Sequence, residues 1–427
     1  MRKLIATAST AALLTAGLAT PAWAAAPDAP TDVQVAWIGD KIRVTWKDNG
    51  EANVVRAEYL NEGQKNIKAT TAAGADNEVL IARNLILNRD RIQLTVDAKG
   101  ADQSVSPAAA SPLFDALVPV YPIIEDADLL ADGSVRLNRW TQPAIQDATP
   151  GDPLDRPASD GYLGAQVVVP GSPAKERMLI PAGATSFTVP PRPRPATITL
   201  YAGNEWRESS LHLEGHGRER KVEVGTMAAS FSVPAMGVYS HYLDIKTTLK
   251  SNLTNFGPPV QLQARPNSAS PWKTYGRYNG EVGDTFDTGM ASLGERQYRI
   301  WVPPAKEVTM LAIKLTPAAS TSAKSSKTIA KIYTRGIVAS KARAGRMVGL
   351  KVQVQPAIDM KAALQKWDGK QWRYVRELAL KAGVASIQFR ATAPAGTTRY
   401  RVLTPPVKVN GLPVLATSTS YFTLTVY

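Results

Sequence analysis

Short runs of alternating apolar and polar residues recur along the chain. The segments "KIRVTW" (41–46), "RIQLTV" (91–96), "TITLYA" (197–202) and "RYRVL" (399–403) place an apolar side chain at every second position. A period of two predicts half-buried β-strands, and the 31 Pro and 30 Gly residues predict tight turns between them. We therefore expect an all-β protein of many short strands.

Two stretches near the C-terminal end are nearly the same. "RQYRIWVPP" (296–304) and "TRYRVLTPP" (398–406) share a Tyr-Arg pair and a following Pro-Pro pair. Trp272 and Leu262 precede the first stretch much as Trp372 and Leu364 precede the second. The repeat predicts one late strand in two tandem copies of a domain, with its Tyr packed inward and the matched tryptophans in the two cores.

Each copy spans about 95 to 100 residues and is expected to close on a strand, "MLAIKLTP" (310–317) in the first and "YFTLTVY" (421–427) in the second. About seven short strands per hundred residues is the size of an immunoglobulin-like β-sandwich. The two copies resemble the Ig-like repeats of secreted actinobacterial proteins, in which a hairpin similar to "WDGKQWRYV" (367–375) is common.

The N-terminal half shows a related pattern. "APDAPTDVQVAWIGDKIRVTW" (26–46), followed by "IQLTVDAKGADQSVS" (92–106), resembles a fibronectin type III module with its opening prolines and early-strand Trp46. It departs from that family where Ile92 and Leu94 stand in place of a late-strand Tyr. The next hundred residues look like a diverged relative that carries a Pro/Asp-rich insertion, "TQPAIQDATPGDPLDRPASDG" (141–161).

These patterns predict four tandem β-sandwich domains after a signal peptide. The expected boundaries are 1–24 for the signal peptide, 25–113 for a fibronectin type III-like domain, 114–223 for its diverged relative, 224–318 for an Ig-like repeat and 319–427 for a basic Ig-like repeat. The Ala/Ser/Thr/Lys-rich segment 316–328 is expected to be a flexible linker.

The first 24 residues predict export. A basic start, an apolar run and Ala22-Trp23-Ala24 form the pattern of a secretory signal peptide with a small-x-small cleavage site. No later run approaches the roughly 20 apolar residues that a membrane-spanning helix needs. The chain has no Cys, so about 400 residues must be held by ordinary cores rather than disulfides. We expect a protein that is secreted or held non-covalently at the cell wall.

Catalytic motifs are scarce. His212 and His216 stand four apart in a charged segment without the Glu of a zinc-protease motif, and His241 lies in an alternating stretch. No G-x-S-x-G occurs, and four sandwiches leave no larger domain for the carboxylate-lined cleft of a glycosidase. We therefore expect no catalytic residues, no cofactor and no resident metal.

Two acidic segments leave calcium open as an alternative, because Ca²⁺ is held by several loop carboxylates. Neither segment has the spacing of an EF-hand loop, and acidic surface loops are common on secreted domains. The residues concerned are Asp126, Asp128 and Asp132 in the first segment and Asp147, Asp152, Asp155 and Asp160 in the second.

The positive charge is concentrated at the C-terminal end. The net charge is −2 over residues 27–113, −4 over 114–223, +3 over 224–318 and +15 over 319–427, where 18 Lys and Arg face three acidic residues. Such asymmetry favours an anionic partner for the last domain. An anionic cell-wall polymer or an acidic polysaccharide fits an exported protein, whereas no nucleic-acid-binding motif is present. A solubility surface, or docking on the acidic half, is the alternative.

One hairpin combines this charge with an aromatic ring. Trp367 enters the Asp368-Gly369 turn without an aromatic counterpart in the other repeat, and Lys370, Arg373 and Arg376 follow it. A Trp among cations can stack on a sugar while the cations meet phosphates or carboxylates. These four residues are the predicted ligand-binding site, and partial burial of Trp367 under a neighbouring loop is the alternative.

The sequence as a whole predicts a secreted, non-catalytic binding or adhesion protein of the cell envelope. An accessory or catalytic part of a secreted carbohydrate-active hydrolase, and a purely structural spacer, are the alternatives.

Overall fold

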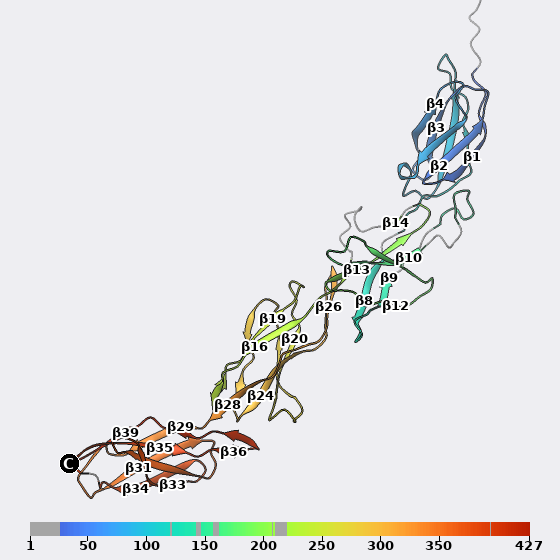
Figure 1. Ribbon diagram of the computed structural model, residues 1–427. Helices are drawn as coiled ribbons and strands as arrows, with labels where there is room; N and C mark the ends of the chain where they lie inside the picture. The colour runs from blue at the N-terminus through green and yellow to red at the C-terminus, as the bar shows by residue number, and fades with distance from the viewer. Residues whose placement is uncertain are drawn as a thin grey trace, which may run out of the picture. The chain divides into compact units, whose positions relative to one another are not determined.

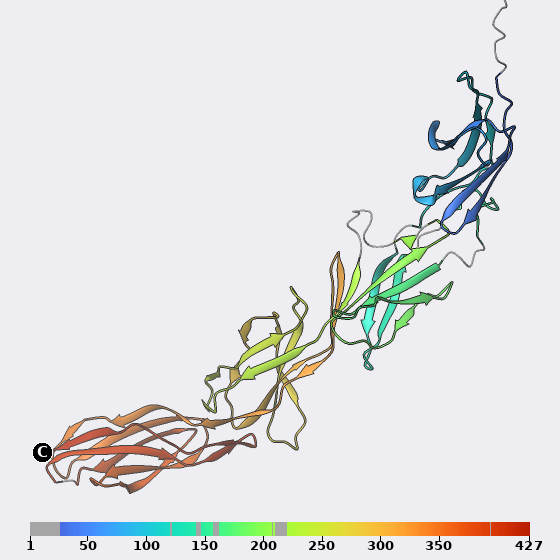
Figure 2. The same ribbon diagram turned by 45° about the horizontal axis from the view of Figure 1, so that its top comes forward.

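The computed structural model describes residues 26–119, 122–141, 147–156, 162–206, 208–209, 220–392 and 394–427 (Figures 1 and 2). The predicted signal peptide lies outside these residues. The chain is all-β, as expected: within the described ranges a single 3-10 turn, Arg83–Leu85, accompanies the strands. None of these residues belongs to a helix long and apolar enough to cross a membrane.

The first sandwich consists of two antiparallel sheets. One sheet has the order β1-β2-β5 and the other β4-β3-β6-β7. Their bounds are Thr31–Ile38 (β1), Lys41–Lys47 (β2), Ala52–Tyr59 (β3), Gln64–Thr71 (β4), Glu78–Ala82 (β5), Ile92–Lys99 (β6) and Ala109–Ala110 (β7). Trp46 is 4% exposed and lies between the sheets with Ile92 and Leu94, so the strands expected from the type III resemblance form this core.

Two later segments close one end of this core and belong to the same compact unit. Leu154, from the Pro/Asp-rich insertion, is buried there, and its carbonyl oxygen accepts a hydrogen bond from Trp37 Nε1 at 2.7 Å. Trp206 is also buried, with its ring 5.0 Å from Trp37 and 6.0 Å from Phe114. The described part of the insertion is therefore a packing element of the first sandwich.

The second sandwich pairs a sheet of order β12-β9-β8 with a sheet of order β11-β10-β13-β15-β26-β25, and β14 pairs with β13. Their bounds are Ile123–Leu129 (β8), Val135–Thr141 (β9), Tyr162–Val168 (β10), Glu176–Ile180 (β11), Phe187–Val189 (β12), Ala196–Gly203 (β13), Glu208–Ser209 (β14), Lys221–Val224 (β15), Ala305–Val308 (β25) and Ala312–Thr316 (β26).

The hairpin β25–β26 corrects one prediction. "MLAIKLTP" was expected to close the third domain, but β26 lies parallel to β15 in the second sandwich, with Ile313 beside Val222 and Leu315 beside Val224. Ile313 and Leu315 are 0% and 1% exposed and belong to the second core. Alternation alone cannot tell which sheet a strand joins, because it specifies a buried face and not a neighbour.

The third sandwich has a sheet of order β16-β19-β22 and a sheet of order β17-β28-β24-β20-β21, to which β27 adds on β24, while β18 pairs with β23. Their bounds are Ala228–Ser232 (β16), Met236–Val238 (β17), Tyr242–Leu243 (β18), Lys246–Lys250 (β19), Pro259–Arg265 (β20), Lys273–Asn279 (β21), Thr285–Asp287 (β22), Met290–Ala291 (β23), Arg296–Val302 (β24), Ala319–Ser320 (β27) and Lys324–Ile329 (β28).

The fourth sandwich repeats this order strand for strand: β29-β31-β34 in one sheet and β30-β39-β35-β32-β33 in the other, with β38 on β35 and a separate hairpin β36–β37. Their bounds are Lys331–Ile337 (β29), Lys341–Ala342 (β30), Met347–Gln355 (β31), Met360–Trp367 (β32), Trp372–Leu380 (β33), Val384–Arg390 (β34), Gly396–Thr404 (β35), Val407–Val409 (β36), Leu412–Val414 (β37), Thr417–Ser418 (β38) and Phe422–Val426 (β39).

The repeat is thus real at the level of topology. Tyr298 in β24 and Tyr400 in β35 are 0% and 4% exposed, so the Tyr of the repeated stretch points inward as predicted. Leu262 and Leu364 are both fully buried in the two cores.

The expected linker, 316–328, is wrong. It contains β27 and most of β28, and β28 closes the third sandwich by pairing Ser326 with Arg296 and Lys324 with Tyr298 of β24. The end of the third sandwich therefore lies near Ile329 rather than at residue 318. Small polar residues suited a linker, but the alternating Ser326 and Thr328 are buried at 1% exposure.

The Pro-Pro pair of each repeat leads into a hairpin that contacts the preceding sandwich. After Pro304, β25–β26 joins the second sandwich, as described above. After Pro406, β36–β37 reaches the third sandwich, where Leu415 N donates to Thr328 O (2.8 Å) and Glu295 N donates to Pro413 O (2.8 Å). The repeated stretch therefore marks both an internal strand and the start of a docking hairpin.

Candidate ligand-binding surface

The predicted binding residues surround the β32–β33 turn. Gly369 has a φ of +99°, a conformation that favours glycine in a tight turn. Asp368 Oδ1 accepts hydrogen bonds from the main-chain N–H of Lys370 and of Gln371, both at 2.8 Å, and Asp368 Oδ2 accepts one from Arg373 Nε at 2.7 Å. The Arg373 guanidinium is the main cause that lowers the pKa of Asp368 to about 2.

The structure brings three of the four predicted residues together. Trp367 is half-buried at the end of β32, Lys370 is exposed in the turn, and Arg373 is exposed beside Asp368. Arg376 lies further along β33, past a bulge in its pairing with β32, and its Nη1 donates to Gln388 O of β34 at 2.9 Å. The turn thus presents an aromatic ring and two cations, and Arg376 adds charge at the sheet edge.

The matched tryptophans are not core residues, which corrects a second prediction. Trp372 is half-buried and pairs with Trp367, whose ring centroid lies 5.4 Å away in an edge-on arrangement. The guanidinium of Arg401 lies over the Trp372 ring at 4.5 Å. Side chains alternate between the two faces of a strand, so Arg401 faces outward because Tyr400 faces the core.

The third sandwich carries the same outward arrangement. Arg299 and Arg265 lie over the Trp272 ring at 4.5 and 4.3 Å, and Arg299 Nε donates to Gln263 Oε1 at 2.8 Å. In the fourth sandwich Arg401 Nε donates to Gln365 Oε1 at 2.7 Å.

We call these sets the outer-face triads: Gln263, Arg299 and Trp272 in the third sandwich, and Gln365, Arg401 and Trp372 in the fourth. The sequence reasoning missed their Gln and Arg members. The sequence did contain a signal for the two arginines, since the residue after an inward-facing Tyr in a strand must point outward. Burial lowers the pKa of both the Arg299 and Arg401 guanidinium groups. An arginine held over an indole can keep N–H groups free to donate hydrogen bonds to an anionic or hydroxylated ligand.

The charge of the fourth sandwich is uncompensated. Residues 331–427 hold 16 Lys and Arg and three acidic residues. Each acidic side chain already has its own cation: Asp359 with Lys381 at 3.0 Å, Asp368 with Arg373 at 2.7 Å, and Glu377 with Lys361 at 3.3 Å. The other cations of this sandwich therefore have no carboxylate of their own domain left to neutralise them.

The first acidic segment serves structure rather than an open ion site. Lys306, from the β25 strand, forms ion pairs with Asp126 and, at 3.0 Å, with Asp128, and Asn138 donates to both carboxylates. These contacts lower the pKa of both carboxyl groups. Asp132 accepts from the main-chain N–H of Ser134 in the β8–β9 turn.

The second acidic segment folds around its own main chain. Asp152 accepts from the N–H groups of Leu154 and Asp155, and Asp115 accepts from Ala148 N at 2.7 Å. Burial raises the pKa of Asp115 and Asp152. Within the ranges that the structure describes, no group of three or more His, Asp or Glu side chains is placed to hold a metal ion.

Three residues of the sequence analysis, Asp160, His212 and His216, lie outside the described residues. His241 lies exposed in a turn after β17.

Several solved structures show a distant likeness to this chain. No protein-family model matches the sequence, and no curated protein is similar to it. The chicken CNTN1 FN1–FN3 domains match at 8% identity over 94% of this chain and 99% of that one, with a TM-score of 0.23. A tetra-tandem repeat from the extending region of a large adhesion protein matches at 11% identity over 92% and 98%, with a TM-score of 0.26.

A Salmonella alpha-2-macroglobulin mutant matches at 11% identity over 94% of this chain and 30% of that one, with a TM-score of 0.19. TM-scores this low leave the function to be argued from the residues of this chain.

Proposed function

We propose that this is a secreted, non-catalytic binding protein of the cell envelope whose fourth sandwich engages an anionic cell-wall polymer or acidic polysaccharide. The observation that carries the proposal is the charge pairing of that sandwich. Its three carboxylates are all paired, so its remaining cations present an uncompensated positive surface. Such a surface attracts a polyanion mainly by releasing condensed counterions.

The β32–β33 turn gives this surface a contact beyond charge. Trp367 and Trp372 stand edge-on at 5.4 Å, and Arg401 covers one face of Trp372. A sugar ring that packs on the Trp367 side would bring its acidic group to Lys370 in the turn, while Arg373 keeps its pairing with Asp368. Stacking responds little to salt, whereas ion pairing weakens with it, so the two contributions are separable by experiment.

A structural spacer is the second candidate, and one observation favours it. The β25–β26 hairpin ties the third sandwich into the sheet of the second, which suits a protein that holds neighbouring domains together. The two functions are compatible in one chain, because the hairpins and the basic turn use different residues.

The test measures retention of residues 25–427 on purified cell walls and on an acidic polysaccharide. We expect binding at about 50 mM salt and its loss by about 500 mM, a span over which the screening length falls severalfold. The variant with Lys370, Arg373 and Arg376 all changed to Gln should bind less and show a flatter salt dependence. Trp367→Ala should weaken binding at every salt concentration.

A matched control removes the same charge elsewhere. Lys41, Lys47 and Arg91 are exposed cations of the first sandwich, and changing all three to Gln should leave retention within about twofold of the wild type, because remote surface charges contribute little. Retention that does not change between the two salt concentrations would contradict the proposal, as would equal losses in the two triple variants.

A further inference from the structure

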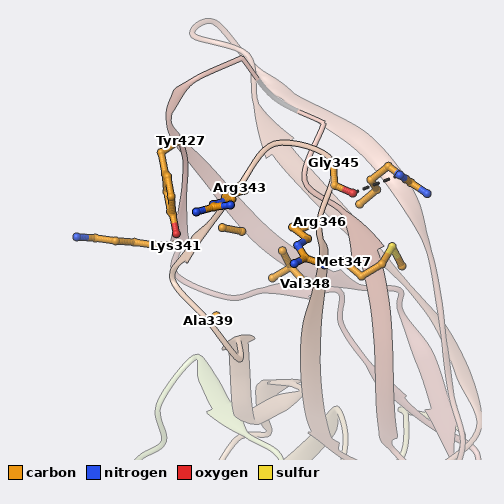
Figure 3. A pocket seen from close by; sticks show the side chains of 10 residues that line it. Ala339, Lys341, Arg343, Gly345, Arg346, Met347, Val348 and Tyr427 are labelled. Carbon is orange, nitrogen blue, oxygen red and sulfur yellow. Dashed lines mark hydrogen bonds between the residues drawn. The ribbon is translucent and has the colours of Figure 1, made fainter.

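A pocket opens at the end of the fourth sandwich where β39 ends (Figure 3). Its volume is about 610 Å³, and four of its lining residues are the cations Lys341, Arg343, Arg346 and Arg390. None of its lining side chains is acidic. Figure 3 labels Tyr427, Arg343 and Lys341 at the same end of the sandwich, with the Lys341 side chain extending away from Arg343.

These four cations lack acidic side-chain partners among the described residues. In the part of the chain that the structure describes, none of them lies within ion-pair distance of an acidic side chain, and the three acidic residues of this sandwich are occupied by other cations. Arg390 Nη1 donates to Gly345 O at 3.2 Å, which leaves its other guanidinium N–H groups available. Like charges crowded without counter-charge favour the binding of an anion.

The loop that carries two of the arginines is held in place by its main chain. Ala344 N donates to Tyr427 O (3.1 Å), Gly345 N donates to Ala391 O (2.8 Å), and Ala391 N donates to Arg346 O (2.9 Å). A loop fixed at both ends loses little main-chain freedom when a ligand binds, so the main chain that carries Arg343 and Arg346 is positioned in advance.

The pocket lies at one end of the fourth sandwich. The corresponding end of the third sandwich receives the β36–β37 hairpin. Gly294 and Gly396 each stand four residues before the matched Tyr and have φ values of +140° and +136°. A Cβ added at Gly294 would lie 2.4 Å from Leu412 Cβ of the β36–β37 hairpin, whereas at Gly396 it would meet nothing within 4 Å. The glycine and its backbone conformation are therefore kept in the fourth sandwich, where no described residue contacts a Cβ placed at Gly396.

Main-chain pairing aligns the two ends residue by residue. The hydrogen bond from Tyr239 N to Ile329 O (2.8 Å) corresponds to that from Ala344 N to Tyr427 O (3.1 Å). Likewise β17 lies parallel to β28 as β30 lies parallel to β39.

This alignment matches Met236 with Lys341 and Val238 with Arg343. Two apolar positions of the third sandwich are therefore cationic in the fourth. An apolar hairpin gains nothing from two unpaired charges, because covering them would cost their desolvation. The residues at this end fit an anion better than another hairpin.

We propose that this pocket binds the phosphate group of a phosphodiester polymer. This inference rests on the proposed function and assigns the site that anchors the polymer. Three arginines come from two elements, the loop before β31 and the end of β34, and line the same pocket. Guanidinium forks match the several oxygens of a phosphate and donate to them in pairs.

The strand register brings the pocket and the β32–β33 turn to the same end of the sheet. Gly396, at the start of β35, pairs with Val426, and four residues later Tyr400 pairs with Lys366, just before Trp367. Figure 1 marks the C-terminus at the end of this domain opposite β36. A polymer with one phosphate in the pocket can therefore extend toward the turn, where Trp367 and Lys370 lie.

The experiment measures binding of the chain 25–427 to poly(glycerol phosphate) by titration calorimetry at about 50 mM salt. Two double variants lose equal charge: Arg343→Gln with Arg346→Gln in the pocket, and Lys370→Gln with Arg376→Gln near the turn. We expect the pocket variant to weaken binding at least about 30-fold and the turn variant less than about fivefold. All four side chains are exposed, so unchanged thermal unfolding checks that both variants fold.

Polygalacturonate, a carboxylate polymer, is the second probe. The pocket variant should lose its preference for the phosphodiester polymer, while the wild type prefers it. Equal losses in the two double variants, or no preference between polymers in the wild type, would overturn the pocket assignment and leave the proposed function standing. A wild-type chain that binds neither polymer would overturn both.

Discussion

The clearest test of the architecture is Ile313→Ala in β26. Ile313 belongs by sequence to the third repeat, but its side chain is 0% exposed in the core of the second sandwich, beside Val222 of β15. The prediction is that this change destabilises the second sandwich, although β26 follows β15 by about 90 residues in the chain.

The magnitude follows from the buried volume. Ile→Ala removes three methyl or methylene groups, about 2.4 kcal/mol of transfer free energy at ~0.8 kcal/mol each. The cavity left in a packed sheet raises the free energy lost to about 3–4 kcal/mol. Met310→Ala is the control, because Met310 lies in the same hairpin but is 80% exposed, and it should cost less than about 0.5 kcal/mol.

Hydrogen exchange shows which sandwich loses stability. A fall of about 3 kcal/mol should speed exchange of the slowest amides in β13 and β15 roughly 100-fold while those of β20 and β24 keep their protection. Loss of protection in β20 and β24 with β15 unchanged would refute the assignment of the hairpin to the second sandwich. Unfolding in urea then gives the free energy itself.

Two further predictions use matched or paired residues. Gly396→Ala should lower the free energy of unfolding by about 1–3 kcal/mol through backbone strain. Gly294→Ala should lower it further, because the added Cβ would press on Leu412. Equal shifts in thermal unfolding would mean that the β36–β37 hairpin is not docked at Gly294. The Asp368 carboxyl should titrate with a pKa of about 2 by NMR, and Arg373→Gln should raise that pKa toward 3.8. Because the folded pKa is the lower one, the stabilisation from this pair is present above about pH 4 and is lost as the pH falls toward 2.

The sequence predicted what depends on short-range pattern. Alternation identified the strands, and the repeated Tyr-Arg stretch identified one strand in two sandwiches, with Tyr298 and Tyr400 both inward. These features depend only on which face of a strand is buried, and the sequence states that directly.

The sequence could not predict which sheet a strand joins. The β25–β26 hairpin and β28 have similar alternation, yet the first pairs with β15 and the second with β24. β26 buries Ile313 and Leu315 and β28 buries Ser326 and Thr328, so the choice of sheet depends on contacts between residues far apart in the chain. Lys306 adds one such contact by pairing with Asp126 and Asp128, which a reading of local segments cannot see.

The prediction that the matched tryptophans lie in the cores was wrong for a different reason. A matched, bulky aromatic was expected to be core, but Trp272 and Trp372 lie under arginines on the outer face. An arginine stem and guanidinium can cover an indole almost as an apolar neighbour does, so a large ring can be half-buried outside the core. The candidate site was accordingly predicted in part, with Trp367, Lys370 and Arg373 at the turn and without the Arg401 that covers Trp372.

Protection of a sheet edge is another physical reason for cations at the end of a sandwich, because charged residues on an edge strand discourage pairing with another chain. β30 is such an edge strand, and Lys341 alone would serve that purpose. Arg343 and Arg346 lie beyond β30 in the loop, and Arg390 comes from β34 in the opposite sheet, where none of them can block the edge of β30. Three arginines gathered from outside that edge are better explained by an anion that they bind together.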